Sequence, residues 1–206
     1  MSDGDPSGGK HARGPYSKGI ARRHQIIRNA IEEFAERGVD GTSLRTLGEA
    51  IGVSHATLRH YFASRDELLV EVYREHEERV TAGAGFEGGA VETIAASAER
   101  NRAIPGLVRL YATLATDALQ EAHPISTEFI GARFRQLRAS LADSIREGQD
   151  AGRIAPDIDP VDAAALIIAA SDGLQVQWLL APDEVDVRRS LTLLERLFPG
   201  SSDTSR

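Results

Sequence analysis

Apolar residues recur at helical spacing over most of this chain. In the first such stretch they fall at i, i+3, i+4, i+7 and i+8, on one face of a helix. These positions are Ile27, Ala30, Ile31, Phe34 and Ala35. Gly38 follows at the place where a glycine commonly ends a helix. No stretch alternates for long in the manner of a β-strand, so the pattern predicts an all-α protein.

Two short helices and a longer one are predicted to follow. The first begins behind Thr42 or Ser43 and the second behind Ser54, because Ser and Thr oxygens cap helix N-termini. Between them Gly52 permits the left-handed backbone of a tight corner. A Ser-x-x-Glu capping box at residues 64–67 opens the longer helix. Two short helices that meet at a glycine corner, with a third packed beneath them, form a helix-turn-helix arrangement.

A glycine-rich segment separates the second half of the chain from the first. Residues 82–89 contain four glycines, which predicts the end of the long helix and a domain boundary. Beyond it, helices are predicted over residues 90–101, 104–121, 125–150, 160–180 and 184–198. The predicted organisation is a disordered arm at 1–18, a helix-turn-helix domain with its connecting helix at 19–80, a linker at 81–89, a second helical domain at 90–199 and a disordered tail at 200–206.

The composition excludes several classes of protein. Of the 206 residues 41% are hydrophobic, so the chain can bury a core, and the absence of Cys excludes disulfide scaffolds and thiolate metal sites. No run of about 18 apolar residues occurs, so no membrane-spanning helix is expected. The N-terminus lacks the apolar stretch of a secretory signal. We therefore expect a cytoplasmic protein without a membrane partner.

Charge is distributed unevenly along the chain. The net charge is −7, yet residues 10–65 hold 10 Lys and Arg against 5 Asp and Glu. Residues 66–206 hold 14 basic side chains against 24 acidic ones. The basic part contains the predicted helix-turn-helix, which favours a polyanionic partner for that part alone.

The second short helix carries side chains suited to DNA recognition. In a helix-turn-helix this helix enters the major groove, so residues near its N-terminus must be polar on the outer face. The polar positions are His55, Thr57, Arg59 and His60, whereas Leu58 can pack inward. Arg presents a bidentate donor pair suited to guanine, and Thr can contact a thymine methyl group or a phosphate.

Two spaced motifs cover residues 22–75. They are Ile27-x-x-Ala30-x-x-x-Phe34-x-x-x-Gly38 followed by Thr42-Ser43-Leu44-Arg45, and Gly52-Val53-Ser54-x-x-Thr57-Leu58-x-x-Tyr61-Phe62-x-Ser64-Arg65-x-x-Leu68. In both, the chain resembles the N-terminal domain of the TetR/AcrR family of transcriptional regulators. The remainder is similar to the family only in its helical layout and an Asp172-Gly173 pair. The resemblance implies a homodimeric, ligand-responsive repressor of a double-stranded DNA operator, whose last two helices form a four-helix bundle across the dimer.

The resemblance also assigns contacts to DNA, residue by residue. They are Thr42 and Arg45 on the first short helix, His55, Ala56, Thr57, Arg59, His60 and Tyr61 on the second, and Arg65 beyond it. Arg59 stands where Tyr is common in the family and adds a charge at the groove. Arg65 stands where Lys is common and keeps a charge for phosphate. Tyr61 is also compatible with a place in the core, and the basic side chains of the arm with plain solvation.

The last two predicted helices offer a dimer interface. The helix over 160–180 is rich in Ala, and small side chains allow two helices to approach closely. The side chains expected to meet a second copy are Ala165, Ala169, Val187, Leu191, Leu194 and Phe198. A twofold dimer predicts a palindromic operator with half-sites about one helical turn, or a multiple of it, apart. The alternative is that these residues pack inside one chain.

Two apolar stripes are candidates for the wall of a ligand pocket. Each has residues at i, i+4 and i+7 of a predicted helix, and they are Leu107, Tyr111 and Leu114, and Ile130, Phe134 and Leu137. With Trp178 they would enclose a small, largely apolar effector, and Gln175 or Asp117 would supply a polar contact. The same stripes are compatible with ordinary core packing.

Enzymatic activity is not expected. A di-iron site in a helical bundle requires a Glu three residues before a His, and none of the histidines has one. Neither a Walker-type phosphate loop nor a Gly-x-Ser-x-Gly elbow occurs. No cofactor and no metal are therefore predicted, and His76 and His123 are interpreted as structural or surface residues. The open alternatives are a helical scaffold protein in place of a DNA-binding regulator, and an activator in place of a repressor.

Overall fold

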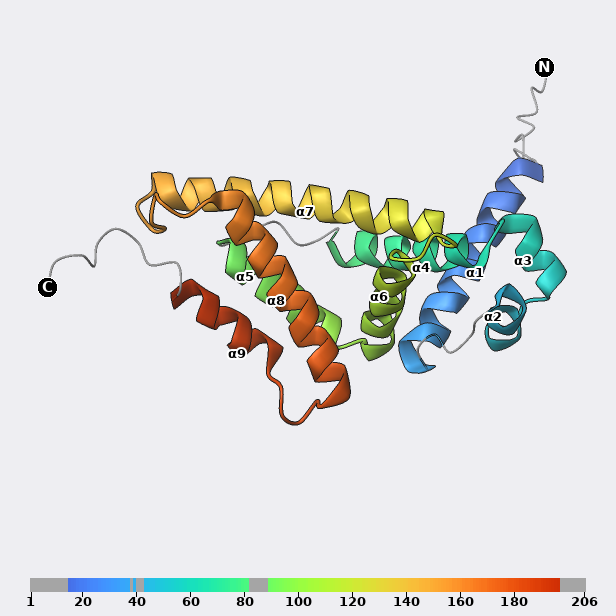
Figure 1. Cartoon of the computed structure of the whole chain (residues 1–206). Coiled ribbons are helices and arrows are strands. Elements are labelled where there is room, and N and C mark those ends of the chain that lie inside the picture. The colour runs from blue at the N-terminus through green and yellow to red at the C-terminus, as the bar shows by residue number, and fades with distance from the viewer. Residues whose placement is uncertain (1–14, 38, 40–42, 82–88, 197–206) are drawn as a thin grey trace, which may run out of the picture.

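Every regular element in the described part of the chain is helical (Figure 1). The computed structural model describes residues 15–37, 39, 43–81 and 89–196. The helices are α1 Pro15–Arg37, α2 Leu44–Ala50, α3 His55–Tyr61, α4 Arg65–Thr81, α5 Ala90–Arg102, α6 Pro105–Asp117, α7 Pro124–Asp150, α8 Pro160–Leu180 and α9 Val187–Thr192, followed by a 3-10 helix, η1, at Leu193–Arg196. The predicted all-α fold, with a helix-turn-helix unit ahead of a longer helical part, is confirmed.

The ends of the predicted segments differ from the observed ones by a few residues. The first helix begins at Pro15, so residues 15–18, which were predicted as the end of a disordered arm, belong to α1. Residues 1–14 of the predicted arm, residues 82–88 of the predicted linker and the predicted tail lie outside the described residues.

The corner between α2 and α3 follows from the local sequence. Ser43 and Ser54 are the N-caps of the two helices, and their hydroxyls accept hydrogen bonds from the backbone N–H groups of Thr46 (3.1 Å) and Thr57 (3.2 Å). Gly52 has a φ of +69°, in the left-handed region. The two caps and the glycine thus fix where α2 stops and where α3 starts.

The front core is shared between the helix-turn-helix unit and α6. Phe34, Leu58 and Phe62 are almost fully buried in a cluster that also contains Leu110 and Leu114 of α6. Since α6 comes after the glycine-rich segment in sequence, that segment does not separate two independent cores. The half of the chain after the glycine-rich segment therefore supplies part of the core on which α1 to α4 are packed.

α6 approaches α1 at backbone distance. A Cβ atom placed on Gly106 would lie 1.7 Å from the carbonyl oxygen of Phe34 and 2.7 Å from that of Ala35. No side chain fits at this point unless one of the two helices moves. The N-terminal end of α6 is therefore held against the C-terminal part of α1.

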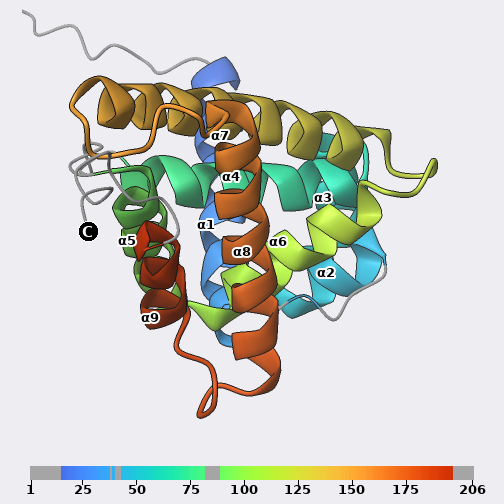
Figure 2. The ribbon, with the colours of Figure 1, turned by 60° about the vertical axis from the view of Figure 1, so that its left-hand side comes forward.

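A second core lies between α5, α7, α8 and α9 (Figure 2). Ile145, Ala164 and Ile167 are almost fully buried in it. Among the described helices, α8 alone is long and apolar enough to pass a test for a membrane span. It packs against α5, α6, α7 and α9, and its apolar side chains contribute to this core.

The inner face of α9 is buried within the chain. Val187, Leu191 and Leu194 are 1%, 0% and 9% exposed, because α9 and η1 belong to the rear core with α5 and α8. These three side chains thus pack against α5 and α8 of their own chain, the alternative that the sequence left open, and their contact with a second copy stays a prediction. Phe198, the fourth residue predicted on this stripe, lies outside the described residues.

Candidate nucleic-acid interface and effector cavity

The polar side chains of α3 face solvent. His55, Arg59 and His60 are exposed, whereas Leu58 is fully buried in the front core. α2 and α3 lie together at one end of the molecule (Figure 1). The helix-turn-helix therefore presents imidazole and guanidinium groups outward on a helix of seven residues.

The predicted contacts on α2 are only partly within the described residues. The side chain of Arg45 is 77% exposed, and its Nε lies 3.1 Å from the carboxylate of Glu49. An exposed ion pair of this kind is weak and exchanges easily for another anion. Thr42 lies outside the described residues, and Ala56 of α3 is exposed.

Thr57 and Tyr61 are less exposed than the other residues of α3. The hydroxyl of Thr57 lies 2.8 Å from that of Ser54, so it takes part in the cap of its own helix. Tyr61 is partly buried against the front core, and its ring meets that of His60 edge to face, with centroids 4.8 Å apart. Tyr61 thus packs partly against the core, and its contact with DNA stays a prediction.

Arg65 is held by two carboxylates. Its Nη1 lies 2.6 Å from Asp117 of α6 and 3.2 Å from the neighbouring Asp66, and its side chain is 16% exposed. A phosphate contact requires a guanidinium that can reach the DNA backbone. In this structure Arg65 joins the first turn of α4 to the last turn of α6, and its contact with a phosphate stays a prediction.

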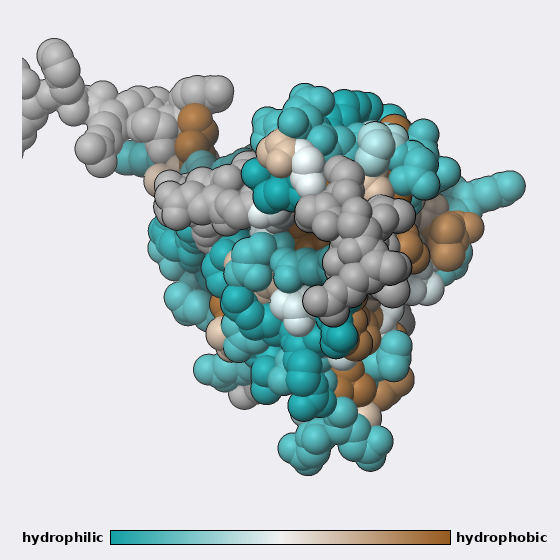
Figure 3. All heavy atoms as spheres, turned by 90° about the vertical axis from the view of Figure 1, so that its left-hand side faces the viewer, coloured by the Kyte–Doolittle hydropathy of each residue, from teal (hydrophilic) through white to brown (hydrophobic). Residues whose placement is uncertain are grey.

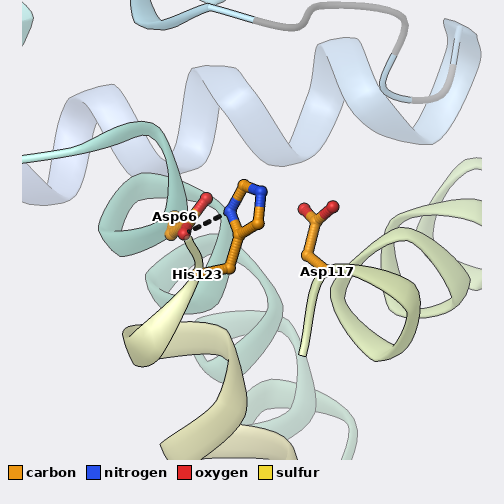
Figure 4. A group of neighbouring side chains, drawn as sticks. All are labelled: Asp66, Asp117 and His123. Carbon is orange, nitrogen blue, oxygen red and sulfur yellow. Dashed lines mark hydrogen bonds and ion pairs between the residues drawn. The ribbon is translucent and has the colours of Figure 1, made fainter. Parts of the chain in front are cut away.

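Asp66, Asp117 and His123 converge at this junction (Figure 4). His123 directly precedes α7, and its Nδ1 lies 2.7 Å from Oδ2 of Asp66. The ligand atoms of the three side chains lie within 4.8 Å of one another, and their types suit a metal ion. Arg65, however, already places its positive charge against both carboxylates. The group is therefore best described as an ion-pair network that joins α4, α6 and the start of α7.

A small cavity lies among α4, α5, α6, α7 and α8. Its volume is about 20 Å³, which is room for about one water molecule. Its lining residues are Tyr73, His76, Asn101, Leu107, Val108, Tyr111, Arg133, Asp172 and Gln175. Two of these are aliphatic and the others are polar, charged or aromatic with a hydroxyl group. The wall is thus more polar than the apolar stripes of the sequence predicted.

Arg133 is the cation of this cavity. It forms an ion pair with Glu77 of α4, and its guanidinium carbon lies 5.6 Å and 5.3 Å from the ring centroids of Tyr73 and Tyr111. Burial raises the pKa of Glu77, and Arg133 partly offsets this. Burial also raises the pKa of both tyrosines above the usual range, so their hydroxyls stay protonated at neutral pH.

Asp172 supplies the carboxylate of the cavity wall. The hydroxyl of Tyr111 donates a hydrogen bond to its Oδ2 at 3.0 Å. Burial raises the pKa of Asp172, against the opposing effects of that hydrogen bond and of Arg133. Elsewhere on the wall, Nδ2 of Asn101 donates to Oε1 of Gln175 at 3.1 Å. Side-chain hydrogen bonds thus join α8 to both α5 and α6 around the cavity.

The cavity takes up only part of the predicted pocket. Leu107, Tyr111 and Gln175 line it. The other predicted residues lie elsewhere: Leu114 and Ile130 in the front core, Trp178 in the rear core, Phe134 and Leu137 packed against the cores, and Asp117 on Arg65. Apolar spacing identifies the buried face of a helix, but it does not tell which short length of that face meets a cavity. Sequence reasoning did not identify Arg133, because Arg135 and Arg138 lie beside the same stripe and nothing in the sequence tells which arginine is buried.

The outer face of α8 is apolar and exposed. Ala165, Ala169 and Gly173 are exposed at intervals of four residues, and no atom lies within 4 Å of a Cβ placed on Gly173. The large apolar side chains exposed on this helix are Val161, Leu166, Val176 and Leu180. Figure 3 shows hydrophobic residues gathered along the right-hand edge of a mostly hydrophilic face. Exposed apolar surface concentrated on one element is typical of a protein–protein contact.

Both halves of the chain match known family models. Residues 26–72 match the model of the bacterial regulatory proteins of the tetR family. Residues 127–199 match the model of the C-terminal part of BetI-type transcriptional repressors. The first range contains α2, α3 and about half of α1 and of α4, whereas the second contains α8, α9 and most of α7.

Individual proteins of known name are similar over most of the chain. The HTH-type transcriptional repressor Rv1474c of Mycobacterium tuberculosis is 28% identical over 177 residues, which cover 85% of this chain and 91% of that protein. A transcriptional regulator of Rhodococcus sp. Rha1 has the same fold, with a TM-score of 0.68 and 19% identity over 85% of this chain and 95% of its own. A regulator from Saccharomonospora viridis, solved in complex with choline, has a TM-score of 0.66 and 21% identity over 86% of this chain and 95% of its own.

Proposed function

Because this chain belongs to the TetR family of bacterial transcriptional regulators, we propose that it is a cytoplasmic, ligand-responsive repressor that binds a palindromic DNA operator as a homodimer. Its named relatives are transcriptional regulators and repressors, so the chain is a regulator and not an enzyme. The observation that carries the proposal is the solvent-exposed polar face of α3, held at one end of the molecule by the capped corner after α2.

The reading of DNA is assigned to α3 and its support to α2. A helix of seven residues whose first residues, His55 and Ala56, are exposed can enter the major groove. Arg59 has the bidentate donor pair that suits O6 and N7 of guanine, and His55 and His60 add donors or acceptors for base edges. Arg45 exchanges its weak pair with Glu49 for a phosphate. Phosphate contacts then set the register in which Arg59 meets the bases.

The dimer is assigned to the outer face of α8. The small residues Ala165, Ala169 and Gly173 allow a second helix to approach closely, and Leu166 and Val176 supply apolar area around them. A twofold contact of this face with itself is isologous and closes after two copies. Two reading units related by a twofold axis require an operator with the same symmetry.

The effector site is assigned to the cavity, and α4 is the element that couples it to DNA. Tyr73 and His76 of α4 line the cavity, while Arg65 in the first turn of α4 is tied to Asp117. A ligand that binds more tightly when α4 takes another position shifts the protein toward that position and so lowers operator affinity. The largest possible effect equals the difference in the ligand's binding free energy between the two positions of α4. The choline complex of the Saccharomonospora viridis neighbour supports a small-molecule effector in a protein of this fold.

The test is selection of genomic DNA fragments by the purified full-length protein, followed by a salt titration of the best sequence. We expect an enriched palindrome whose affinity falls steeply as salt rises, because phosphate contacts release counterions. Size-exclusion chromatography with light scattering gives the oligomeric state in the same buffer. No enrichment at low salt with a protein that is confirmed to be dimeric would contradict the proposal and favour a helical scaffold role.

A further inference from the structure

The cavity wall has hydrogen-bond acceptors that the described part of the chain leaves partly or wholly without a donor. Asp172 receives one hydrogen bond, from the hydroxyl of Tyr111, and no nitrogen of a described Lys, Arg or His lies within 4.0 Å of its carboxylate. His76 is 8% exposed, and none of the hydrogen bonds of the described residues involves its ring. Burial and the charge of Arg79 lower the pKa of His76, so its ring is neutral at neutral pH and one nitrogen accepts.

Arg133 is the cation of the cavity wall, and its buried Nε has no hydrogen-bond partner among the described residues. Arg133 forms its ion pair with Glu77 and stacks over the rings of Tyr73 and Tyr111. Arg133 acts on Asp172 electrostatically but forms no ion pair with it, so this half-buried carboxylate has no cation of the described residues in direct contact. Such a charge is costly and is stabilised by any cation that can reach it with an N–H donor.

We propose that the effector is a small aliphatic amine in its protonated form, a class that adds to the proposed function and rests on it. The ammonium group donates hydrogen bonds to the carboxylate of Asp172 and to the neutral ring of His76. The alkyl chain lies against Leu107 and Val108, the aliphatic part of the wall. Neutral alcohols lack the charge, carboxylates carry the wrong sign, and quaternary ammonium ions lack an N–H donor.

The size of the cavity connects this ligand to regulation. A volume of about 20 Å³ holds about one water molecule, so an amine with an alkyl chain enters only if a wall moves. Tyr73 and His76 are the wall residues on α4, the helix that follows α3 in the chain. Binding of the amine therefore favours a placement of α4 that differs from the one described here, and operator affinity falls with it.

The first experiment compares four probes on the full-length protein at matched ionic strength: butylammonium, butanol, butyrate and tetramethylammonium. Calorimetry measures binding, and fluorescence anisotropy measures affinity for the selected operator. We expect butylammonium to bind roughly tenfold or more tightly than the other three, as a charge-assisted hydrogen bond allows. It alone should weaken operator binding. Equal binding of butanol, butyrate or tetramethylammonium would overturn the proposal, and so would no binding of butylammonium.

The second experiment uses variants of the wall. Asp172→Asn should weaken butylammonium binding by roughly tenfold or more, while Asp183→Asn, which removes an exposed carboxylate from the loop after α8, should leave it unchanged. Tyr111→Phe keeps the charge of Asp172 and removes its one hydrogen-bond donor, so butylammonium should bind at least as well as to the parent chain. If Asp172→Asn does not fold, the Tyr111→Phe variant and the comparison of the four probes still test the proposed amine site. An unchanged affinity in a folded Asp172→Asn variant, or a loss of binding in a folded Tyr111→Phe variant, would refute the assignment.

Failure of this proposal is distinguishable from failure of the proposed function, because operator binding is measured without any probe. An operator that is bound but not released by butylammonium contradicts the amine and leaves the repressor in place. A protein that binds butylammonium through Asp172 but enriches no DNA supports the amine site and contradicts the repressor.

Discussion

The α2–α3 unit and the cavity both gather polar side chains, but they do so under opposite conditions. In the α2–α3 unit the polar groups come from a single stretch, residues 43–62, and most of them are exposed. In the cavity they come from five helices, and Tyr73, His76 and Gln175 are less than a tenth exposed. A polar group at the surface keeps its hydration, whereas a buried one must find its partners inside the protein.

This difference predicts what a substitution changes in each region. An exposed side chain of α2 or α3 can be removed with little effect on folding, so its loss should be visible in the binding of a partner. Removal of a cavity side chain leaves other buried polar groups without their partner, so its loss should be visible in stability first. The four predictions that follow test this contrast, beginning with the largest effect.

Arg133→Ala is expected to cause the largest loss of stability. It leaves Glu77 without its ion pair and Asp172 without the nearby positive charge. The free energy of unfolding should fall by about 3 kcal/mol, since breaking a largely buried ion pair leaves an uncompensated charge. Urea denaturation measures the change. Arg135→Ala, an exposed arginine two residues further along α7, is the matched control and should change stability by less than about 0.5 kcal/mol. Equal stability of the two variants would contradict the role of Arg133.

Arg59→Ala should weaken operator binding by about 1–3 kcal/mol, the range for loss of a bidentate contact to a base. Arg45→Ala should weaken binding to all sequences alike and reduce the salt dependence by about one phosphate contact. Neither variant should change the free energy of unfolding by more than about 0.5 kcal/mol, because both side chains are exposed. Anisotropy titrations at several salt concentrations measure the first two effects. Unaltered operator binding in both variants would show that another face of the molecule reads DNA.

Arg65→Ala should affect stability more than it affects DNA binding. Asp117 and Asp66 lose a guanidinium that lies 2.6 Å and 3.2 Å from them, which should cost about 1–2 kcal/mol of unfolding free energy. Operator affinity should fall less than in Arg59→Ala. Arg65→Lys should be intermediate, because an ammonium is a point charge and does not present the guanidinium fork. If Arg65→Ala is as stable as the parent and the salt dependence of its DNA binding falls by about one phosphate contact, the phosphate contact that the sequence predicted is supported instead.

The smallest effect is expected from His76→Gln, and it should depend on pH. Burial lowers the pKa of His76 in the folded chain, so the unfolded chain binds a proton more readily. His76 therefore contributes fully to the stability of the parent protein above about pH 6.5, the pKa of an unfolded histidine. This contribution is lost as the pH falls below that pKa. The variant lacks the contribution, so its unfolding free energy should decrease less between about pH 7.5 and pH 5.5. The raised pKa values of Asp172 and Glu77 act in both proteins and cancel in the comparison. Parallel pH profiles would contradict the role of His76.

The structure of the α2–α3 unit could be predicted almost completely from the sequence, because the residues that determine it act locally. Ser43 and Ser54 cap helices through N–H groups only three residues away, and Gly52 turns the chain through its own φ angle. Each of these acts within one helical turn, so the order of residues contains the information. The spacing of Leu58 relative to Arg59 and His60 likewise separates the inner from the outer face of α3.

The cavity and the junction of α4 with α6 could not be predicted in this way. The stripes of α6, α7 and α9 correctly identified buried faces, but Val187 turned out to meet its own chain and Leu114 to lie away from the cavity. Arg65 had the residue type of a phosphate contact, and only the position of Asp117, 52 residues away, gave it another partner.

The sequence by itself therefore determined the helices, the corner between α2 and α3, and the polar face that α3 presents. The tertiary structure alone decided which of the buried faces meet one another, which carboxylate pairs with Arg133, and where a cavity lies between the helices. The physical reason is that helical periodicity records how much of a side chain is buried, whereas an ion pair or a cavity depends on the partner that packing brings to it.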